Sequence, residues 1–277
     1  MGPSPLAGER PGERSDGDGF LKPRVVILRA AGTNCDLETA HAFEMAGAAV
    51  ETVHINQFTR GLRRLSEFRI LAIPGGFTYG DDVSAGRILA NEMRCLLQDQ
   101  IREFVASAKL VIGICNGFQA LVKAGILPVG TVGDKPLATL TDNLNGRFQC
   151  RWTHLLVNEA ASPPFLHGMD GQVLEIPIAH GEGRYVSAPE TMQRLRDEKQ
   201  IALQYCGPNG ELGDRYNVNG SALHAAAISA HGGRVLGLMP HPERCVYGVQ
   251  HPRWTREGLR PEGQGLAIFR NAVRFCE

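Results

Sequence analysis

Short apolar runs that alternate with helical stretches dominate the first half of this 277-residue sequence. The runs are brief and rich in β-branched residues, as expected for buried strands, and they occur at 25–28, 49–55, 69–74 and 109–114. Helical patterns lie at 36–47, with Asp36 as the expected N-cap, around 92–107 and at 117–125. Strands that alternate with helices indicate a parallel sheet between layers of helices. We therefore predict an α/β fold with a doubly wound, mostly parallel sheet and helices on both faces.

The alternation weakens after about residue 130, where apolar runs at 153–157, 173–178, 223–228 and 234–239 predict further strands. The first 22 residues are rich in Gly, Pro and charge, a composition that cannot bury enough apolar surface to order itself. We expect residues 1–22 to be a disordered leader and residues 23–277 to form one domain of flavodoxin-like character.

Charge and cysteine content narrow the function classes. Lys+Arg and Asp+Glu number 29 each, whereas a nucleic-acid binder usually carries a basic excess. The sequence shows no secretion signal and no run typical of a membrane span. The seven cysteines show no CxxC spacing and no zinc-like cluster with a nearby histidine. We expect reduced thiols in a cytoplasmic protein, no metal site, and no nucleic-acid or membrane partner.

The segment Gly113-Ile114-Cys115-Asn116-Gly117 has the form of a nucleophile elbow with Cys in place of Ser. It follows a predicted buried strand and precedes a predicted helix, so the middle side chain is expected to stand exposed at the sheet's edge. The N-terminus of that helix would lie beneath the sulfur and favour the thiolate, which is the reactive form. The pattern predicts that Cys115 is a nucleophile.

The segment Pro240-His241-Pro242-Glu243 follows the apolar run 235–239 and supplies a candidate base. Residues two apart in an extended chain point the same way, and the prolines disfavour helix here. We therefore expect the Glu243 carboxylate to orient the imidazole of His241, as in a Cys/His/acid triad.

A third glycine-rich turn, Pro74-Gly75-Gly76-Phe77, ends another predicted strand. Attack on a carboxamide creates an oxyanion, which needs preorganised backbone N–H donors. Gly75 and Gly76 can bring the backbone close to such an oxyanion, and the N–H of Asn116 is the expected second donor.

These motifs resemble those of class I (triad) glutamine amidotransferases, and more narrowly the glutaminase subunits of phosphoribosylformylglycinamidine synthases. The matching stretches run in the family's order from about residue 24 to the C-terminus. They are GTNCD (32–36), PGGFTYGDD (74–82), GICNGFQ (113–119), GRFQCRW (146–152), PIAHGEGRY (177–185) and PHPER (240–244).

The resemblance implies that Cys115 forms a γ-glutamyl thioester, that His241 is the acid/base, and that Glu243 orients it. It also implies that Gln119 helps to hold the substrate glutamine. The ammonia would pass to a synthetase partner, with a small accessory subunit in the complex, that converts formylglycinamide ribonucleotide to formylglycinamidine ribonucleotide in purine synthesis. No phosphate-binding loop is evident in this chain, so ATP and Mg are expected on the partner and no cofactor here.

Several alternatives stay open at this point. The chain could instead be a glutaminase whose ammonia goes to another acceptor, in GMP, CTP or anthranilate synthesis. Interpretations from other classes are a peptidase, a chaperone or a catalytically silent regulatory subunit. Cys150 is the second candidate nucleophile. His180 is expected in a Gly-rich loop with Glu182 and Arg184, where it could touch glutamine, the partner or neither. The segments 211–229 and 246–265 depart from the family pattern, and their roles are unassigned.

Overall fold

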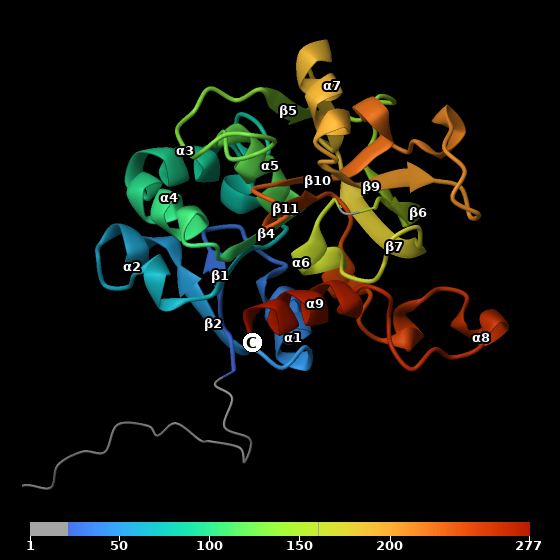
Figure 1. Ribbon diagram of the computed structural model, residues 1–277, viewed down its shortest axis with the longest axis horizontal. Helices are drawn as coiled ribbons and strands as arrows, with labels where there is room; N and C mark the ends of the chain where they lie inside the picture. The colour runs from blue at the N-terminus through green and yellow to red at the C-terminus, as the bar shows by residue number, and fades with distance from the viewer. Residues whose placement is uncertain (1–21, 160) are drawn as a thin grey trace, which may run out of the picture.

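The computed structural model describes residues 22–159 and 161–277 (Figure 1). Its main sheet has nine strands in the order β2-β1-β3-β4-β11-β10-β9-β6-β7. These strands are β1 (Arg24–Arg29), β2 (Ala49–His54), β3 (Ile70–Ile73), β4 (Leu110–Ile114), β6 (Gln149–Val157), β7 (Val173–His180), β9 (Ile201–Cys206), β10 (Ala225–Ala230) and β11 (Val235–Leu238). Two short strands, β5 (Ala138–Thr141) and β8 (Arg184–Ser187), form a separate antiparallel pair.

The sheet has a parallel half and an antiparallel half. Strands β2, β1, β3, β4 and β11 pair in parallel, whereas β10, β9, β6 and β7 extend the sheet in antiparallel pairings. The predicted α/β class with a mostly parallel sheet is confirmed. The chain beyond residue 130 supplies the antiparallel strands, which explains why the strand–helix alternation weakens there in the sequence.

Helices cover both faces of the parallel half. On one face α5 packs on β4 and β11, with α3 beside it, while α1 and α9 lie on the other face with α6 against α9 (Figure 1). The helices are α1 (Asp36–Met45), α2 (Ile55–Thr59), α3 (Arg87–Leu96), α4 (Gln98–Ala106), α5 (Asn116–Lys123), α6 (Pro163–Leu166), α7 (Pro189–Asp197), α8 (Trp254–Glu257) and α9 (Leu266–Cys276). The central strands are therefore sandwiched, as their continuous apolar sequences require.

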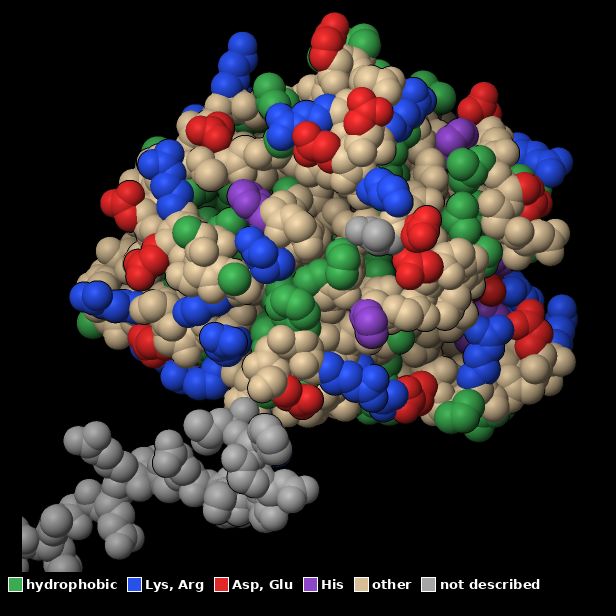
Figure 2. All heavy atoms as spheres, in the orientation of Figure 1, with side chains coloured by type: hydrophobic (Ala, Val, Ile, Leu, Met, Phe, Trp, Pro, Cys, Tyr) green, Lys and Arg blue, Asp and Glu red, His purple; other side chains and the backbone are tan. Residues whose placement is uncertain are grey.

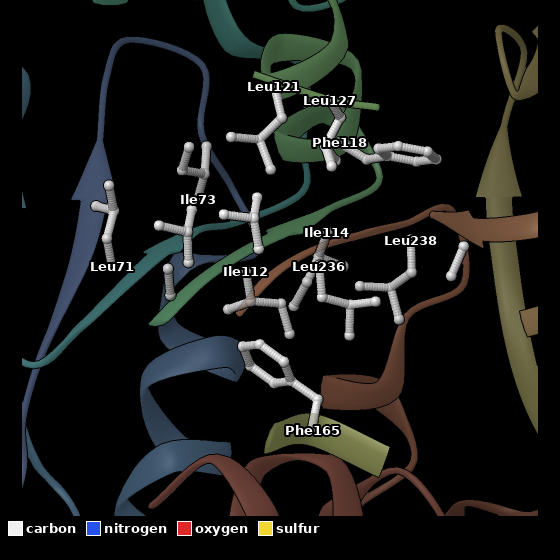
Figure 3. Packing of buried hydrophobic residues seen from close by; sticks show 14 of the residues in the cluster. Leu71, Ile73, Ile112, Ile114, Phe118, Leu121, Leu127, Phe165, Leu236 and Leu238 are labelled. Atoms are coloured by element: carbon white, nitrogen blue, oxygen red, sulfur yellow. The ribbon is translucent and has the colours of Figure 1, made fainter. Parts of the chain in front are cut away.

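The core is centred on β3, β4 and β11. Every residue of β3 and β4 is buried, because each of these strands has a neighbour on both sides and helices above and below. Figure 3 shows Phe118 and Leu121 of α5 on one side of these strands and Phe165 of α6 on the other. Truncating a central residue such as Ile112 to Ala is expected to cost about 2–5 kcal/mol of stability. This packing holds the carboxyl end of β4, and hence Cys115, in a fixed place.

Two local predictions need correction. The helix expected around 92–107 is two helices, α3 and α4, because Leu97 between them has non-helical angles (φ −122°, ψ 10°). Asp36 is the first residue of α1 and not its N-cap, and its carboxylate pairs with Arg29 at 3.2 Å. The predicted leader, apart from Lys22, lies outside the described residues.

The surface carries charge of both signs. On the face shown in Figure 2, Lys and Arg side chains are interspersed with Asp and Glu, in agreement with the balanced composition. None of the helices in the described ranges has the length and apolarity needed to cross a membrane.

Candidate active site

Cys115 lies at a sharp turn between a strand and a helix. β4 ends at Ile114 and α5 begins at Asn116, and between them Cys115 has φ 50° and ψ −103°. A positive φ is strained for a residue with a side chain, and such strain is concentrated at functional sites. Gly117 allows α5 to approach the sheet, since a Cβ there would lie 2.0 Å from the carbonyl oxygen of Ile73. The backbone thus forms the strand–turn–helix that the glycine pattern predicts.

The thiol of Cys115 is nearly buried and faces the end of β7. Its Sγ donates to the carbonyl of Ala179 at 3.6 Å, and only 6% of the residue is exposed. The first turn of α5 directs backbone N–H groups that lack helical partners toward the same side. A negative charge that forms next to this sulfur is therefore near backbone donors.

His241 and Glu243 form a buried pair just beyond β11. Imidazole Nδ1 of His241 lies 2.6 Å from carboxylate Oε1 of Glu243, and the backbone N–H of His241 donates to the carbonyl of Pro177 at 2.8 Å. The two side chains are 3% and 0% exposed, so their interaction is shielded from water. Burial lowers the pKa of His241, but the Glu243 carboxylate and the Cys115 thiol outweigh it and raise that pKa well above its ordinary value.

The local backbone of this pair differs from the prediction. The sequence favours an extended segment, whereas Pro242–Arg244 forms a 3-10 turn with proline at its first position. Proline is favoured at the first helical position because its fixed φ suits a helix start and its missing N–H is not needed there. The side chains of His241 and Glu243 nevertheless meet, because the turn folds the carboxylate back onto Nδ1.

Gly75 is the point at which these groups converge. A Cβ on Gly75 would lie 2.9 Å from Cε1 of His241 and 3.4 Å from both Cβ of Cys115 and Sγ of Cys35. The absence of a side chain at Gly75 therefore lets the imidazole and the thiol approach one another. His241 Nε2 is buried and has no hydrogen-bond partner within the described part of the chain. The neighbouring Gly76 has φ 134°, a conformation that favours glycine, and it lines the adjacent cavity.

A cavity of about 220 Å³ opens beside Cys115. This volume is below the range of about 300–1,000 Å³ typical of pockets for drug-sized ligands, so it suits a molecule the size of an amino acid. A larger cavity of about 640 Å³ lies between α7 and β9, but no triad residue lines it. The lining of the smaller cavity consists of Gly76, Phe77, Asp81, Ala85, Cys115, Gln119, Asp142, Phe148, Ala179, His180, Gly181 and Glu182.

Gln119 and Asn116 belong to a hydrogen-bond network in one wall of this cavity. Gln119 Nε2 donates to the backbone carbonyl of Glu182 at 2.6 Å, and its Oε1 accepts from Asn116 Nδ2 at 3.0 Å. Asn116 Nδ2 also donates to Oδ1 of Asp81 at 2.9 Å. Burial and the charge of Glu182 raise the pKa of Asp81. Sequence reasoning did not single out Asp81, although it belongs to the matching stretch 74–82.

His180 is placed differently from the prediction. It is the last residue of β7, not part of a loop, and Arg184 begins β8, which leaves only 181–183 between the strands. The His180 ring is buried, with Nδ1 3.1 Å from Oδ1 of Asn143. Burial, and the charge on His241, lower the pKa of His180 to about 4. A neutral His180 therefore lines the cavity.

Two other cysteines lie in contrasting surroundings. Cys150, the alternative nucleophile, is exposed on β6. Cys35 was not predicted to lie at the site, yet it is buried beside Gly75 and its Sγ accepts from Nη2 of Arg244 at 3.0 Å. In the sequence GTNCD is only a matching motif, and nothing in its spacing relates Cys35 to Arg244.

Comparisons with known proteins show the family to which the chain belongs. The family described as the CobB/CobQ-like glutamine amidotransferase domain matches residues 22–276. The chain is 50% identical over 257 residues to phosphoribosylformylglycinamidine synthase subunit PurQ of Dehalococcoides mccartyi, which covers 92% of this chain and 98% of that protein. It is 39% identical over 270 residues to the PurQ subunit of Archaeoglobus fulgidus, covering 92% of this chain and 97% of that protein.

Solved structures show the same architecture. The PurLQS structure from Thermotoga maritima matches with a TM-score of 0.72 and 30% identity, covering 93% of this chain and 100% of that chain. A putative GMP synthase component from Thermoplasma acidophilum matches with a TM-score of 0.51 at 13% identity, covering 93% of this chain and 95% of that chain, which shows a shared fold alone. The chain therefore belongs to the CobB/CobQ-like glutamine amidotransferases and, within them, to the family of PurQ subunits of phosphoribosylformylglycinamidine synthase.

Proposed function

We propose that this chain hydrolyses glutamine to glutamate and ammonia through a triad of Cys115, His241 and Glu243. The observation that carries the proposal is the convergence of these groups at Gly75. A strained elbow presents the thiol, and a buried carboxylate holds the imidazole 2.6 Å away through Nδ1. Nε2 of that imidazole is left without a partner in the described chain, on a ring that packs against Gly75 beside the thiol.

In the first half-reaction the Cys115 thiolate attacks the carboxamide carbon of glutamine. The C=O bond becomes an oxyanion, for which the backbone N–H groups of Gly75 or Gly76 and of Asn116 are the proposed donors. The imidazolium of His241 then gives its proton to the departing nitrogen, and the C–N bond breaks. Ammonia leaves, and a γ-glutamyl thioester remains on Cys115.

In the second half-reaction a water molecule attacks the thioester carbon. Neutral His241 takes a proton from that water, and the C–S bond breaks to release glutamate and the Cys115 thiolate. The Glu243 carboxylate fixes the proton on Nδ1 and stabilises the imidazolium. Both steps need the same imidazole, which its burial and the hydrogen bond from Nδ1 to Glu243 hold in one orientation.

The cavity wall supplies the proposed contacts for glutamine. Gln119 is almost fully buried, and its amide is held by Glu182 and Asn116, so it is a rigid part of the wall. We assign Gln119 to positioning the substrate. The volume of about 220 Å³ agrees with an amino-acid substrate.

The ammonia is delivered to a synthetase partner. The PurQ relatives are named as subunits of phosphoribosylformylglycinamidine synthase, and the similar solved structure is a PurLQS assembly. In this proposal the partner uses ATP and Mg to convert formylglycinamide ribonucleotide to formylglycinamidine ribonucleotide, together with a small accessory subunit. This chain itself carries no cofactor and acts in the cytoplasm as a component of the carbon–nitrogen ligase.

The direct test is glutamine-dependent amidation of formylglycinamide ribonucleotide by the chain mixed with the purified synthetase and accessory subunit. Product should form with glutamine only when this chain is present, whereas ammonium salt should support the reaction with or without it. A matched mixture with Cys115→Ala should use ammonium salt alone. Glutamine turnover without transfer to this acceptor, but with transfer to a precursor of GMP, CTP or anthranilate, would reassign the acceptor.

A further inference from the structure

A cavity of about 420 Å³ lies between α3, α5 and β5, and the proposed function does not use it. Helix α3 and strand β5 both pack against α5, so the three elements border this space (Figure 1). None of the triad residues lines it. Its volume is within the range of about 300–1,000 Å³ that is typical of pockets for small molecules.

Positively charged side chains are concentrated in the lining of this cavity. Arg87 and Arg94 belong to α3, and Lys123 is the last residue of α5. Arg87, Asn91 and Arg94 follow an i, i+4, i+7 spacing, which puts them on one face of α3. Among the described residues that line the cavity there is no carboxylate, and neither guanidinium has an ion-pair partner within the described chain. A cavity with three cations in a chain of balanced charge suits an anion.

Lys123 is the most enclosed of the three cations, with only 14% of its side chain exposed. Its Nζ donates to Oγ of Ser84 and to the carbonyl of Ala85, both at 2.5 Å, and lies 3.6 Å from Oε2 of Glu182. Burial lowers the pKa of Lys123, although the Glu182 carboxylate opposes this shift. A second anion at the cavity would therefore stabilise the charged ammonium and compete with Glu182 for it.

The lining indicates the chemical class of the ligand. A phosphate monoester carries a charge of about −1.5 to −2 at neutral pH, which matches the two unpaired guanidinium groups, and arginine binds phosphate oxygens in a bidentate way. The amide of Asn91 and the hydroxyl of Thr139 offer hydrogen bonds to hydroxyl groups. The described lining contains no aromatic side chain on which a nucleobase could stack. These features favour a phosphorylated sugar over a nucleotide.

The cavity is connected to the site at Cys115 through one hydrogen-bonded segment. Ser84 Oγ donates to Oε2 of Glu182 at 3.2 Å, and the backbone N–H of Ala85 donates to Oε1 of the same carboxylate at 3.2 Å. The backbone carbonyl of Glu182 accepts from Gln119, the proposed substrate-positioning residue, at 2.6 Å. A group that draws Lys123 away from Glu182 would therefore disturb the support of Gln119.

We propose that the cavity between α3, α5 and β5 binds a small phosphorylated sugar through Arg87, Arg94 and Lys123, and that its binding weakens the binding of glutamine at Cys115. The phosphate takes Lys123 from Glu182, so the segment that holds Gln119 loses its ion pair. By thermodynamic linkage, glutamine weakens the binding of the sugar phosphate by the same factor. The coupling rests on the proposed function, whereas the binding site itself does not.

Binding is measured first, without reference to activity. Isothermal titration calorimetry with ribose 5-phosphate, ribose and inorganic phosphate compares wild type, Arg87→Gln, Arg94→Gln and the control Arg60→Gln, which changes an exposed arginine at the end of α2. Melting curves check that each variant is folded. We expect one ribose 5-phosphate per chain in wild type and the control, and about 10–100-fold weaker binding in the other two, since each loses a hydrogen bond between charged groups. Ribose should not bind, and inorganic phosphate should bind more weakly than ribose 5-phosphate.

Two results would overturn the site: no binding of ribose 5-phosphate, or equal affinity in wild type, Arg87→Gln and Arg94→Gln. Binding of inorganic phosphate as tightly as ribose 5-phosphate would contradict the assignment of a sugar.

Coupling is measured as glutamate release at increasing glutamine, with the partner present and with or without ribose 5-phosphate. We expect the ligand to raise KM for glutamine about 5-fold or more in wild type, and not in Arg94→Gln at the same concentration. An unchanged KM in wild type would refute the coupling, and a rise that persists in Arg94→Gln would place the ligand on the partner. Binding with no glutaminase activity in any variant would contradict the proposed function and leave the site standing.

Discussion

The imidazole of His241 is held through Nδ1 by Glu243 at 2.6 Å, and both side chains are sealed from solvent. His241→Ala should lower kcat by about 10²–10⁴-fold, the usual contribution of a general acid/base. Glu243→Gln should cost less, because the amide can still accept a hydrogen bond at Oε1 but lacks the charge. Steady-state glutamate release in the presence of the partner measures both.

The double variant shows whether this pair acts as a unit. His241→Ala/Glu243→Gln should be little slower than His241→Ala alone, since Glu243 acts only through the imidazole. Losses that simply add on a logarithmic scale would mean that the two side chains act independently, and the triad assignment of Glu243 would be wrong.

A substitution at Gly75 tests how closely the Cys115 thiol and the His241 imidazole must approach for catalysis. Gly75→Ala introduces a Cβ 2.9 Å from Cε1 of His241, so the ring must move. Displacement of a catalytic group by a fraction of an ångström to 1 Å can cost about 10²-fold in rate, and we expect a loss of kcat of that order. The control is Gly213→Ala, where the new Cβ would meet only Tyr216 at 3.9 Å. Equal activity of the two variants would show that a Cβ at position 75 does not displace the catalytic imidazole of His241.

Substitutions of Gln119 test whether this residue helps to bind the substrate glutamine. Gln119→Ala removes the donor to the Glu182 carbonyl and the acceptor for Asn116, and leaving such buried groups unpaired costs about 1–3 kcal/mol each. We expect KM for glutamine to rise about 10-fold or more, with a smaller change in kcat. Gln119→Glu keeps the shape but sets a carboxylate oxygen against the Glu182 carbonyl, so it should also raise KM. An unchanged KM with a lower kcat would remove Gln119 from the substrate site.

The buried His180 is expected to make the folded chain less stable as the pH falls. Its pKa is ordinarily 6.5, and burial lowers it to about 4 in the folded chain, so the unfolded chain binds a proton first as the pH falls. The stability contributed by neutral His180 is therefore complete above pH 6.5 and is lost between 6.5 and about 4. The shift corresponds to about 3 kcal/mol.

Urea unfolding across that pH window measures the effect. The free energy of unfolding should fall more steeply for wild type than for His180→Asn, whose amide nitrogen takes the place of Nδ1 and can still donate to Asn143 but does not titrate. The exposed histidine variant His167→Gln should follow wild type. Parallel curves for wild type and His180→Asn would show that another group causes the acid sensitivity.

The parts of the site that sequence could predict are local. The elbow at Cys115 and the His241–Glu243 pair depend on residues within a few positions of each other, so glycine and proline spacing was sufficient to locate them. The central strands were equally predictable, because β3 and β4 are buried on both faces and read as continuous apolar runs.

Other features depend on contacts between distant segments. Asp81 lines the cavity and accepts a hydrogen bond from Asn116 of a different segment, and Cys35 reaches the imidazole only because β1 and β11 share a sheet. In strand β9 the polar Gln204 interrupts the apolar pattern, and its amide is satisfied by a contact that the sequence does not show, a hydrogen bond to the Leu223 carbonyl at 2.7 Å. The break between α3 and α4 carries no Gly or Pro to mark it.

The identity of the nucleophile is the central claim, and it is tested most directly by trapping the covalent intermediate. The chain in complex with its partner is mixed with glutamine, quenched in acid during turnover, and digested for mass spectrometry. We predict a γ-glutamyl thioester on the peptide that contains Cys115, and no adduct on that peptide in Cys115→Ala, which should also release no glutamate. A thioester on the peptide of Cys35 or Cys150, or glutamate release that survives Cys115→Ala, would contradict the account.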